Sequence, residues 1–364
     1  MIKEIRTENY KSIQKLKLNP GRITVLIGEN GCGKSNILEA IALSSATSQD
    51  KLDNEFLVSR GIRVTEPQFM RAAFDKENVA KAIRISLATD RLESDLTCVL
   101  QNNNQPYSKW ENIEFPDFKK DAKKHLAKAV YADYISEFIG LDRFLIYSPE
   151  NLSLCTFEKE GQIQPLGIHG EGLFKLLRVM SSYGNKERLD EIKEKLRVID
   201  WFGDFEIPQN LFGGERQVQI MDRYLDEDLD EDLACFDQKS SNEGFLFLLF
   251  YFALFISDDT PSFFAIDNID ASLNPKLCRR LIKDLVALAE EHDKQAILTT
   301  HNPAVLDGLN LDDDEQRLFV IYRNQLGHTK AKRILKPQPI DGQQPIKMSE
   351  AFLRGYIGGL PKNF

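Results

Sequence analysis

Apolar and polar positions along the chain predict regular elements near both of its ends. Residues 2–18 alternate loosely between the two kinds, as a half-buried hairpin does, and residues 22–27 (RITVLI) are typical of a buried strand. Residues 245–256 (FLFLLFYFALFI) are apolar throughout, and the run is too short to cross a bilayer. It therefore predicts a helix that is buried on all sides.

After this helix, strand and helix patterns alternate. Residues 261–267 (PSFFAID) and 295–301 (QAILTTH) predict strands, with a helix over 275–292 between them, and residues 318–323 (LFVIYR) predict a further strand. Alternation of this kind favours an α/β fold with a parallel sheet.

The middle of the chain has weaker patterns. Residues from about 48 to 145 lack a long clean pattern, and we expect them to form an inserted lobe; residues from about 170 to 240 are expected to form a helical and mixed insertion. No internal repeat and no long heptad stretch is present, so we expect no long coiled coil. The prediction is one α/β domain, residues 1–364, assembled from both ends of the chain.

Composition narrows the class of protein. The chain has 364 residues and a net charge of −9, which gives no overall attraction to nucleic acid or anionic lipid. None of the five cysteines forms a C-x-x-C pair, which fits a reducing compartment without a zinc site. The first residues lack the apolar core of a secretory signal. We therefore expect a cytoplasmic protein with no membrane partner.

A phosphate-binding loop follows the first buried strand. Residues 28–35 (GENGCGKS) match G-x-x-x-x-G-K-[ST] in full, between a predicted strand and a predicted helix. In such a loop, Lys34 reaches the β- and γ-phosphates and Ser35 binds Mg²⁺. Cys32 lies inside the loop near a helix N-terminus, where the pKa of a thiol tends to fall, but we favour its interpretation as a small residue that fits the loop. The motif predicts ATP and Mg²⁺ as cofactors.

Two further residues end neighbouring predicted strands. Asp267 ends the apolar strand 261–267, where an acidic Mg²⁺ partner of a phosphate loop belongs. His301 ends the next strand, 295–301, and can face the same nucleotide. We expect Ser35 and Asp267 to be the metal ligands.

Several motifs resemble the ATPase heads of the SMC, RecF and OLD group, which are ABC-type ATPases that are not transporters. The form of the loop from Asn30 to Asn36 and the opening NYKSI at residues 9–13 look like theirs. Residues 267–275 (DNIDASLNP) match the group's D-E-P-E-x-x-L-H-P, with Asn268 in place of the glutamate and Asn274 in place of the histidine. His301 matches the switch histidine. The resemblance covers about 1–45 and 240–310, and it implies a P-loop NTPase fold of the ABC/SMC-head type.

The resemblance also implies a set of nucleotide contacts and a homodimer or higher oligomer. In this group two heads enclose two ATP molecules, and each site is completed by a signature segment from the other head. SSNEG at residues 240–244 has the group's spacing before Asp267, whereas LFGGERQ at residues 211–217 resembles the signature in spelling but lies too far upstream. We choose SSNEG and keep the other as the alternative. The implied nucleotide-binding residues are Gly28, Asn30, Gly31, Cys32, Gly33, Lys34, Ser35, Asn36, Ser240, Ser241, Asn242 and Gly244.

Asn268 distinguishes this chain from the group. An asparagine can orient water but cannot take its proton, so we expect ATP to bind, close a dimer and be hydrolysed slowly. The catalytic residues implied are Lys34, Asp267, Asn268, Asp270 and His301, with Asp270 as an alternative base.

The resemblance implies a switch or scaffold in anti-phage defence. We expect no OLD nuclease domain in this chain, so that a separate nuclease or toxin would be the effector. The first alternative is a RecF-like DNA repair ATPase that binds nucleic acid. A transporter ATPase subunit and a small-molecule kinase are further alternatives.

Overall fold

The computed structural model describes residues 1–93, 95–105, 108–113, 140–157, 163–181, 186–208, 216–225, 235–336 and 346–360. The chain divides into two compact units. Unit 1 comprises Met1–Ile146, Pro261–Asp270 and Gln295–Phe364, and unit 2 comprises Tyr147–Thr260 and Ala271–Lys294. Each unit thus contains segments that are far apart in the sequence.

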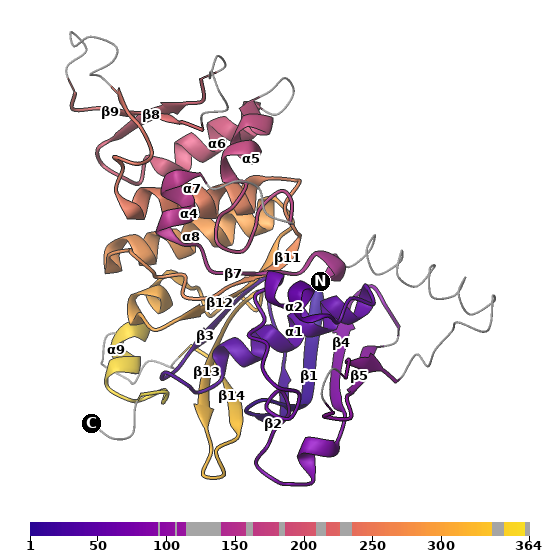
Figure 1. Ribbon diagram of the computed structural model, residues 1–364. Coiled ribbons are helices and arrows are strands. Elements are labelled where there is room, and N and C mark those ends of the chain that lie inside the picture. Colours follow the sequence, from indigo (N-terminus) through magenta and orange to yellow (C-terminus); the bar gives the residue numbers. More distant parts are fainter. Residues whose placement is uncertain are drawn as a thin grey trace. The chain divides into compact units, whose positions relative to one another are not determined.

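The predicted parallel sheet is confirmed. Its strand order is β14-β13-β3-β12-β11-β7, and β3 pairs in parallel with both β12 and β13, while β14 is antiparallel to β13 (Figure 1). The register places Thr300 beside Ile27 and Leu298 beside Ile266, so the carboxyl ends of β3, β11 and β12 meet at one edge. The strands are β3 (Ile23–Ile27), β7 (Ile146–Tyr147), β11 (Phe263–Ile266), β12 (Gln295–Thr300), β13 (Gln316–Arg323) and β14 (Thr329–Ile334).

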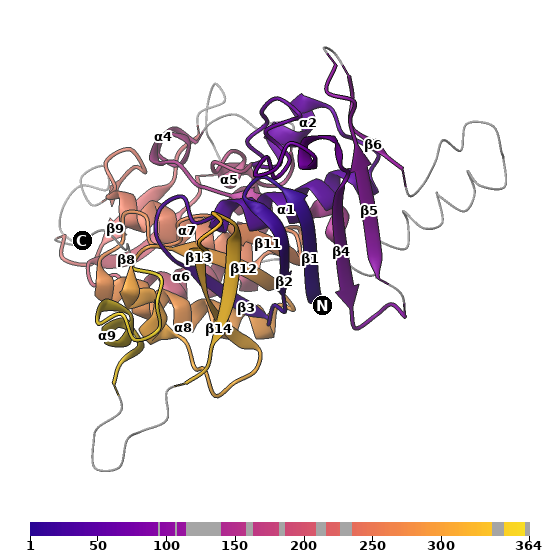
Figure 2. The same ribbon diagram turned by 90° about the horizontal axis from the view of Figure 1, so that it is seen from below.

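A second, antiparallel sheet of unit 1 begins with the predicted N-terminal hairpin. Its order is β2-β1-β4-β5-β6, and Figure 2 shows β2, β1, β4 and β5 side by side. The described part of the expected inserted lobe supplies β4, β5 and β6, so it extends the sheet that the hairpin starts. The strands are β1 (Ile2–Tyr10), β2 (Ile13–Leu18), β4 (Ile83–Thr89), β5 (Leu96–Gln101) and β6 (Glu111–Asn112).

The helix that follows β3 lies in the core of unit 1. α1 (Lys34–Ser48) contacts β1 and β4 of the antiparallel sheet and β12 of the parallel sheet, and for this reason most of its residues are buried. Ile37, Leu38 and Ile41 belong to the same apolar cluster as Ile5 of β1 and Ile297 of β12. This packing fixes the N-terminus of α1 beside the phosphate loop. The remaining helical segments of unit 1 are α2 (Asn54–Ser59), η1 (Asn78–Ala80), η3 (Leu141–Arg143), η5 (Pro303–Gly308) and α9 (Met348–Leu353).

Unit 2 is mainly helical, and the predicted buried helix is its centre. Every residue of α7 (Glu243–Ile256) from Phe245 onward is buried, which agrees with its continuous apolar sequence. α4, α5, α6 and α8 all contact α7. These helices are α4 (Asn151–Thr156), α5 (Leu173–Ser181), α6 (Lys186–Leu196) and α8 (Pro275–Glu291). A small sheet of order β10-β9-β8 completes the unit, with β8 (Phe202–Glu206), β9 (Gln219–Asp222) and β10 (Cys235–Phe236).

Within the described ranges, none of the helices combines the length and the apolar character that a membrane crossing requires. The alternative signature at residues 211–217 lies outside the described residues except for Arg216 and Gln217.

Candidate nucleotide-binding site

The phosphate loop connects β3 to α1 and is shaped by glycines. Gly33 precedes the first residue of α1 with a φ of 107°, and a Cβ there would lie 2.2 Å from the Thr329 hydroxyl. A Cβ on Gly28 would lie 2.2 Å from the carbonyl oxygen of Ile321. Both positions require glycine because any side chain would collide with β13 or β14. The loop is thus held close to these strands, with the N-terminus of α1 directed at its interior, where an anion is favoured.

Lys34 is buried at the start of α1. Its Nζ donates to the carbonyl oxygens of Gly28 at 2.9 Å and Glu29 at 3.2 Å. Burial lowers the pKa of Lys34, and the charges of Asp267 and Asp270 oppose that effect. A phosphate in the loop would restore an anionic partner to this ammonium.

Cys32 agrees with its interpretation as a small residue that fits the loop. The thiol is buried, and burial raises its pKa, although the charge of Lys34 acts in the opposite direction. Loss of water around the sulfur thus outweighs the nearby positive charge.

The two predicted metal ligands lie together. Ser35 Oγ donates to Asp267 Oδ2 at 3.0 Å, while Asp267 Oδ1 accepts a hydrogen bond from the hydroxyl of Thr299. Neighbouring ligands of an octahedral Mg²⁺ lie about 2.9 Å apart when each metal–oxygen bond is about 2.05 Å. Hard oxygen donors at this spacing fit Mg²⁺.

The residues that follow Asp267 form a turn tied to β12. Asn268 has a φ of 57°, and its backbone N–H donates to Thr299 Oγ1 at 2.9 Å. The Thr300 hydroxyl donates to Asp270 Oδ1 at 2.6 Å and accepts from the N–H of Asn302 at 2.9 Å. The side chain of Asn268 is exposed. Thr299 and Thr300 thus each hold one carboxylate in place.

His301 follows β12 and is exposed at the same edge of the sheet. Partial burial and the positive charge of Lys34 lower its pKa, while Asp270 and Asp267 act against this shift. The direction of the shift favours a neutral imidazole at neutral pH, which can both donate and accept a hydrogen bond.

The turn between β1 and β2, within the NYKS sequence, is hydrogen-bonded to the first turn of α1 and to β14. Ser12 Oγ accepts from Asn36 Nδ2 at 2.6 Å and lies 2.6 Å from Thr329 Oγ1, which in turn donates to the carbonyl of Cys32 at 2.8 Å. The N–H of Thr329 donates to the carbonyl of Ser12 at 2.8 Å. Hydroxyl groups from β14 and the turn therefore fix the loop and the first turn of α1.

Asn36 and Glu39 extend this hydrogen-bond network along α1. The buried Glu39 carboxylate is paired with Lys11 and accepts from Arg63 Nε at 2.7 Å, and Arg63 Nη2 donates to Asn36 Oδ1 at 3.3 Å. Tyr10 donates to Glu39 Oε2 at 3.1 Å. These contacts keep Asn36 oriented beside the loop.

The chosen signature segment lies in unit 2 at the N-terminus of α7. Asn242 caps the helix, because its Oδ1 accepts from the N–H of Phe245 at 2.9 Å. Ser240 is exposed, and its hydroxyl donates to Asp237 Oδ1 at 3.0 Å. The hydroxyl of Ser241 is buried without a hydrogen-bond partner among the described residues. Gly244 occupies the first turn of α7.

Sequence reasoning found the loop, Asp267, Asp270 and His301, and unit 1 brings these together at one sheet edge. It did not find the hydroxyl groups of Ser12, Thr299, Thr300 and Thr329. Thr299 and Thr300 belong to the predicted strand 295–301. Two hydroxyl residues at the end of this strand, beside a strand that ends in Asp267, were a signal that could have identified them. Ser12 belongs to the NYKSI stretch that resembles the ATPase group, but its contact with Thr329 gave no signal, because the two positions are 317 residues apart.

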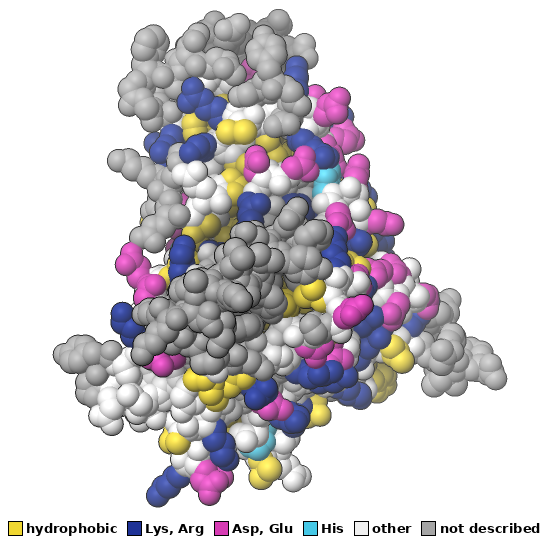
Figure 3. Space-filling model, turned by 90° about the vertical axis from the view of Figure 1, so that its right-hand side faces the viewer, with side chains coloured by type: hydrophobic (Ala, Val, Ile, Leu, Met, Phe, Trp, Pro, Cys, Tyr) yellow, Lys and Arg dark blue, Asp and Glu magenta, His cyan; other side chains and the backbone are white. Residues whose placement is uncertain are grey.

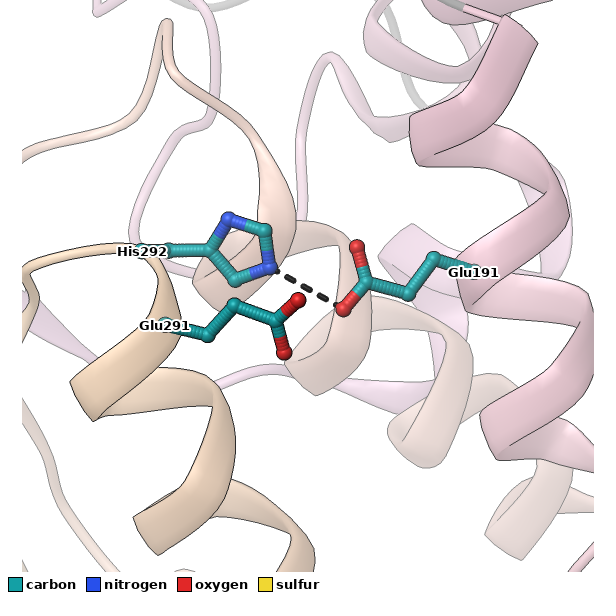
Figure 4. A group of neighbouring side chains, drawn as sticks. All are labelled: Glu191, Glu291 and His292. Carbon is teal, nitrogen blue, oxygen red and sulfur yellow. Dashed lines mark hydrogen bonds and ion pairs between the residues drawn. The ribbon is translucent and has the colours of Figure 1, made fainter.

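A separate cluster in unit 2 brings together Glu191, Glu291 and His292, as Figure 4 shows. The His292 side chain is fully buried, with Nε2 3.0 Å from Glu191 Oε1 and Nδ1 2.8 Å from Arg188 Nη1. Arg188 can only donate, so Nδ1 is the acceptor and Nε2 carries the proton that Glu191 accepts. A metal ion would have to displace that proton beside a guanidinium. We therefore interpret the cluster as a hydrogen-bond network.

Comparisons with known proteins agree with this geometry. A family model described as AAA ATPase domain matches residues 1–245. The DNA replication and repair protein RecF of Bacillus cereus (strain G9842) is 22% identical over 212 residues, which are 55% of this chain and 48% of that protein. The RecF protein of Bacillus anthracis (strain CDC 684 / NRRL 3495) matches equally. The chain spans about half the length of the curated relatives it matches.

Solved structures show the same fold. An SMC head bound to the C-winged helix domain of ScpA has a TM-score of 0.58 and 16% identity, with 92% of this chain and 98% of that chain covered. The SMC head domain from Thermotoga maritima has a TM-score of 0.51 and the same identity and coverage.

The fold and the loop define a P-loop ATPase of the SMC/RecF-like ABC type. The chain belongs to the AAA ATPase domain family.

Proposed function

We propose that this protein is a dimeric switch that binds ATP, hydrolyses it slowly and controls a separate effector protein. One observation carries the proposal. Lys34, Ser35 and Asp267 have the arrangement expected for binding phosphate and metal, but the next residue, Asn268, has an amide side chain instead of a carboxylate. The proposed setting, anti-phage defence with a nuclease or toxin as effector, rests on the OLD-like resemblance of the motifs.

The residues of the loop would bind the triphosphate and Mg²⁺. Lys34 would exchange its carbonyl partners for phosphate oxygens, and Ser35 with Asp267 would hold the ion. Mg²⁺ neutralises charge that develops on the phosphate oxygens during phosphoryl transfer. Thr299 keeps Asp267 oriented, and His301 at the same sheet edge can contact the γ-phosphate or the attacking water as a hydrogen-bond donor.

The rate of hydrolysis would be limited by Asn268. Its exposed side chain can orient a water molecule but has no basic atom, and general-base help is worth about 10²–10⁴-fold. Asp270 is the nearest alternative base in sequence, yet the Thr300 hydroxyl engages one of its oxygens at 2.6 Å. ATP would therefore persist after binding, which suits a switch better than a motor.

The dimer would be closed by the segment at the N-terminus of α7. Ser240, Asn242 and Glu243 are exposed there, and a helix N-terminus favours an anion such as the γ-phosphate of a partner's ATP. Each head would then complete the site of the other.

The test is steady-state ATP turnover of the purified protein beside Asn268→Glu, with Lys34→Ala as the background. We expect a slow wild type and a glutamate variant faster by about 10²–10⁴-fold, because the carboxylate supplies the missing base. Brisk turnover in the wild type, with no gain from glutamate, would show that Asn268 is no brake and that Asp270 or another base carries the reaction.

The second candidate function is a DNA repair ATPase, favoured by the similarity to RecF proteins. The net charge of −9 does not favour it. On the face in Figure 3, described Lys and Arg side chains are interspersed with Asp and Glu. Stimulation of turnover by duplex DNA in the same assay would favour this candidate over the first.

A further inference from the structure

The loop also indicates where the nucleoside part of ATP would lie; this inference rests on the proposed function. Lys34, Ser35 and Asp267 mark the β,γ-phosphate end of the site. In the sheet order β13-β3-β12-β11, Asp267 follows β11 and Thr299 lies in β12, both on one side of β3, and the β13–β14 hairpin lies on the other side. A triphosphate across the loop therefore points its nucleoside end toward this hairpin.

Two segments meet on that side because both are pinned to the β1–β2 turn. The N–H of Lys11 donates to the carbonyl of Met70 at 3.0 Å, and the N–H of Thr329 donates to the carbonyl of Ser12 at 2.8 Å. Arg323 at the end of β13 donates through Nε to the carbonyl of Gly31 at 3.0 Å. The hairpin and the segment 70–74 are thus both fixed next to the phosphate loop.

An aromatic surface results from this arrangement. The rings of Phe74 and His328 have centroids 4.7 Å apart and an interplanar angle of 56°. Gly327, which precedes His328, has a φ of 79°, and a Cβ there would lie 3.2 Å from the Phe74 ring. Phe74 remains 43% exposed and Leu326 71% exposed. The Phe74 ring is therefore held on one side by the hairpin while part of it faces solvent.

We propose that Phe74, supported by His328, is the stacking surface for the purine base of the bound nucleotide. Because its neighbours already hold the Phe74 ring in one orientation, the ring can cover one face of a base without further loss of side-chain entropy. Aromatic side chains commonly stack on bases, and this contact depends little on which base is bound.

The experiment compares two ligands that share the phosphates but not the base. Dissociation constants for ATP and for inorganic tripolyphosphate, each with Mg²⁺, are measured by titration calorimetry for the wild type and Phe74→Ala. We expect Phe74→Ala to weaken ATP binding about tenfold and to leave tripolyphosphate binding unchanged. Phe74→Tyr keeps a stacking ring and should restore ATP binding. Phe69→Ala, at an exposed phenylalanine in the turn before this segment, is the matched control and should bind both ligands as the wild type does.

The outcomes separate this inference from the function on which it rests. A wild type that binds neither ligand overturns the ATP site itself. A wild type that binds ATP no better than tripolyphosphate, or a Phe74→Ala variant with unchanged ATP affinity, overturns the stacking surface and leaves the ATP site standing. An equal loss of both ligands in Phe74→Ala also overturns it, because the loop rather than the base contact would have changed.

Discussion

Thr299 connects three parts of the site through one hydroxyl group. Its Oγ1 donates to Asp267 Oδ1 and accepts from the N–H of Asn268 at 2.9 Å, so it positions the carboxylate and the following turn together. The side chain is fully buried, and water cannot easily replace it. Thr299 is therefore a positioning residue for the metal ligand.

Replacement of Thr299 by valine should weaken Mg²⁺ binding. Loss of the partner that orients a ligating carboxylate typically costs about 10–100-fold in metal affinity. We expect the Mg²⁺ concentration that gives half-maximal ATP turnover to rise by about that factor, while binding of ATP without metal changes little. The measurement is a Mg²⁺ titration of turnover at fixed ATP.

Thr299→Ser separates this role from packing. Serine keeps the hydroxyl, so it should retain the Mg²⁺ dependence of the wild type even if the lost methyl group lowers stability. A valine variant that keeps the Mg²⁺ dependence of the wild type would mean that Ser35 alone orients Asp267.

Some features of the site could be predicted from the sequence and others could not, and the difference has a physical cause. The phosphate loop was found because its contacts are local and its glycines and lysine have fixed spacing. The direction of the Cys32 pKa shift could not be predicted, because a helix N-terminus is visible in sequence whereas the burial that raises the thiol pKa is not. The Ser12–Thr329 pair depends on β14 reaching the β1–β2 turn, which no short pattern encodes.

At the scale of elements, two helices of unit 2 start with asparagine caps. Asn274, which stands where the resembling motif has histidine, accepts from the N–H of Leu277 at 3.0 Å, and Pro275 is the first residue of α8. The departure from the motif thus has a local structural role. Asn242 has the same role at α7.

Replacement of Asn274 by alanine should lower the free energy of unfolding by about 1 kcal/mol, because an N–H at the start of α8 loses its acceptor. Asn274 is exposed, so no core contact is removed. The measurement is urea denaturation followed by circular dichroism. Asn274→Asp, which keeps an acceptor oxygen, should match the wild type, as should Lys276→Ala at a neighbouring exposed position. Equal stability of Asn274→Ala and Asn274→Asp would refute the capping role.

Elements were predictable where their pattern is local. α7 and the parallel strands β3, β11 and β12 follow directly from continuous apolar runs. β4 lies in the range 48–145 that lacks a long clean pattern, and its pairing with β1 was not expected, because the two strands are separated by most of the first 80 residues. Alternation identifies a half-buried strand but does not name its neighbour.

At the scale of the whole molecule, the proposed switch depends on a second copy of the chain. The phosphate loop and Asp267 belong to unit 1, and the segment at the N-terminus of α7 belongs to unit 2. If each head supplies that segment to the other, ATP bound by one copy is a direct ligand of its partner. The dimer should therefore form with ATP and last as long as ATP remains unhydrolysed.

Sedimentation velocity tests this directly. With Mg²⁺ and ATP the wild type should shift from monomer to dimer, because the γ-phosphate links the two copies, whereas Lys34→Ala should stay monomeric. Ser240→Arg changes an exposed residue of the segment and should block the dimer while ATP binding persists; Glu290→Arg, an equally exposed position in α8, should dimerise as the wild type does. Asn268→Glu should form a dimer that decays as its ATP is consumed, so that dimer lifetime and turnover vary inversely.

A wild type that binds ATP but stays monomeric at all protein concentrations would contradict the ATP sandwich, and the slow site would then act within a single chain.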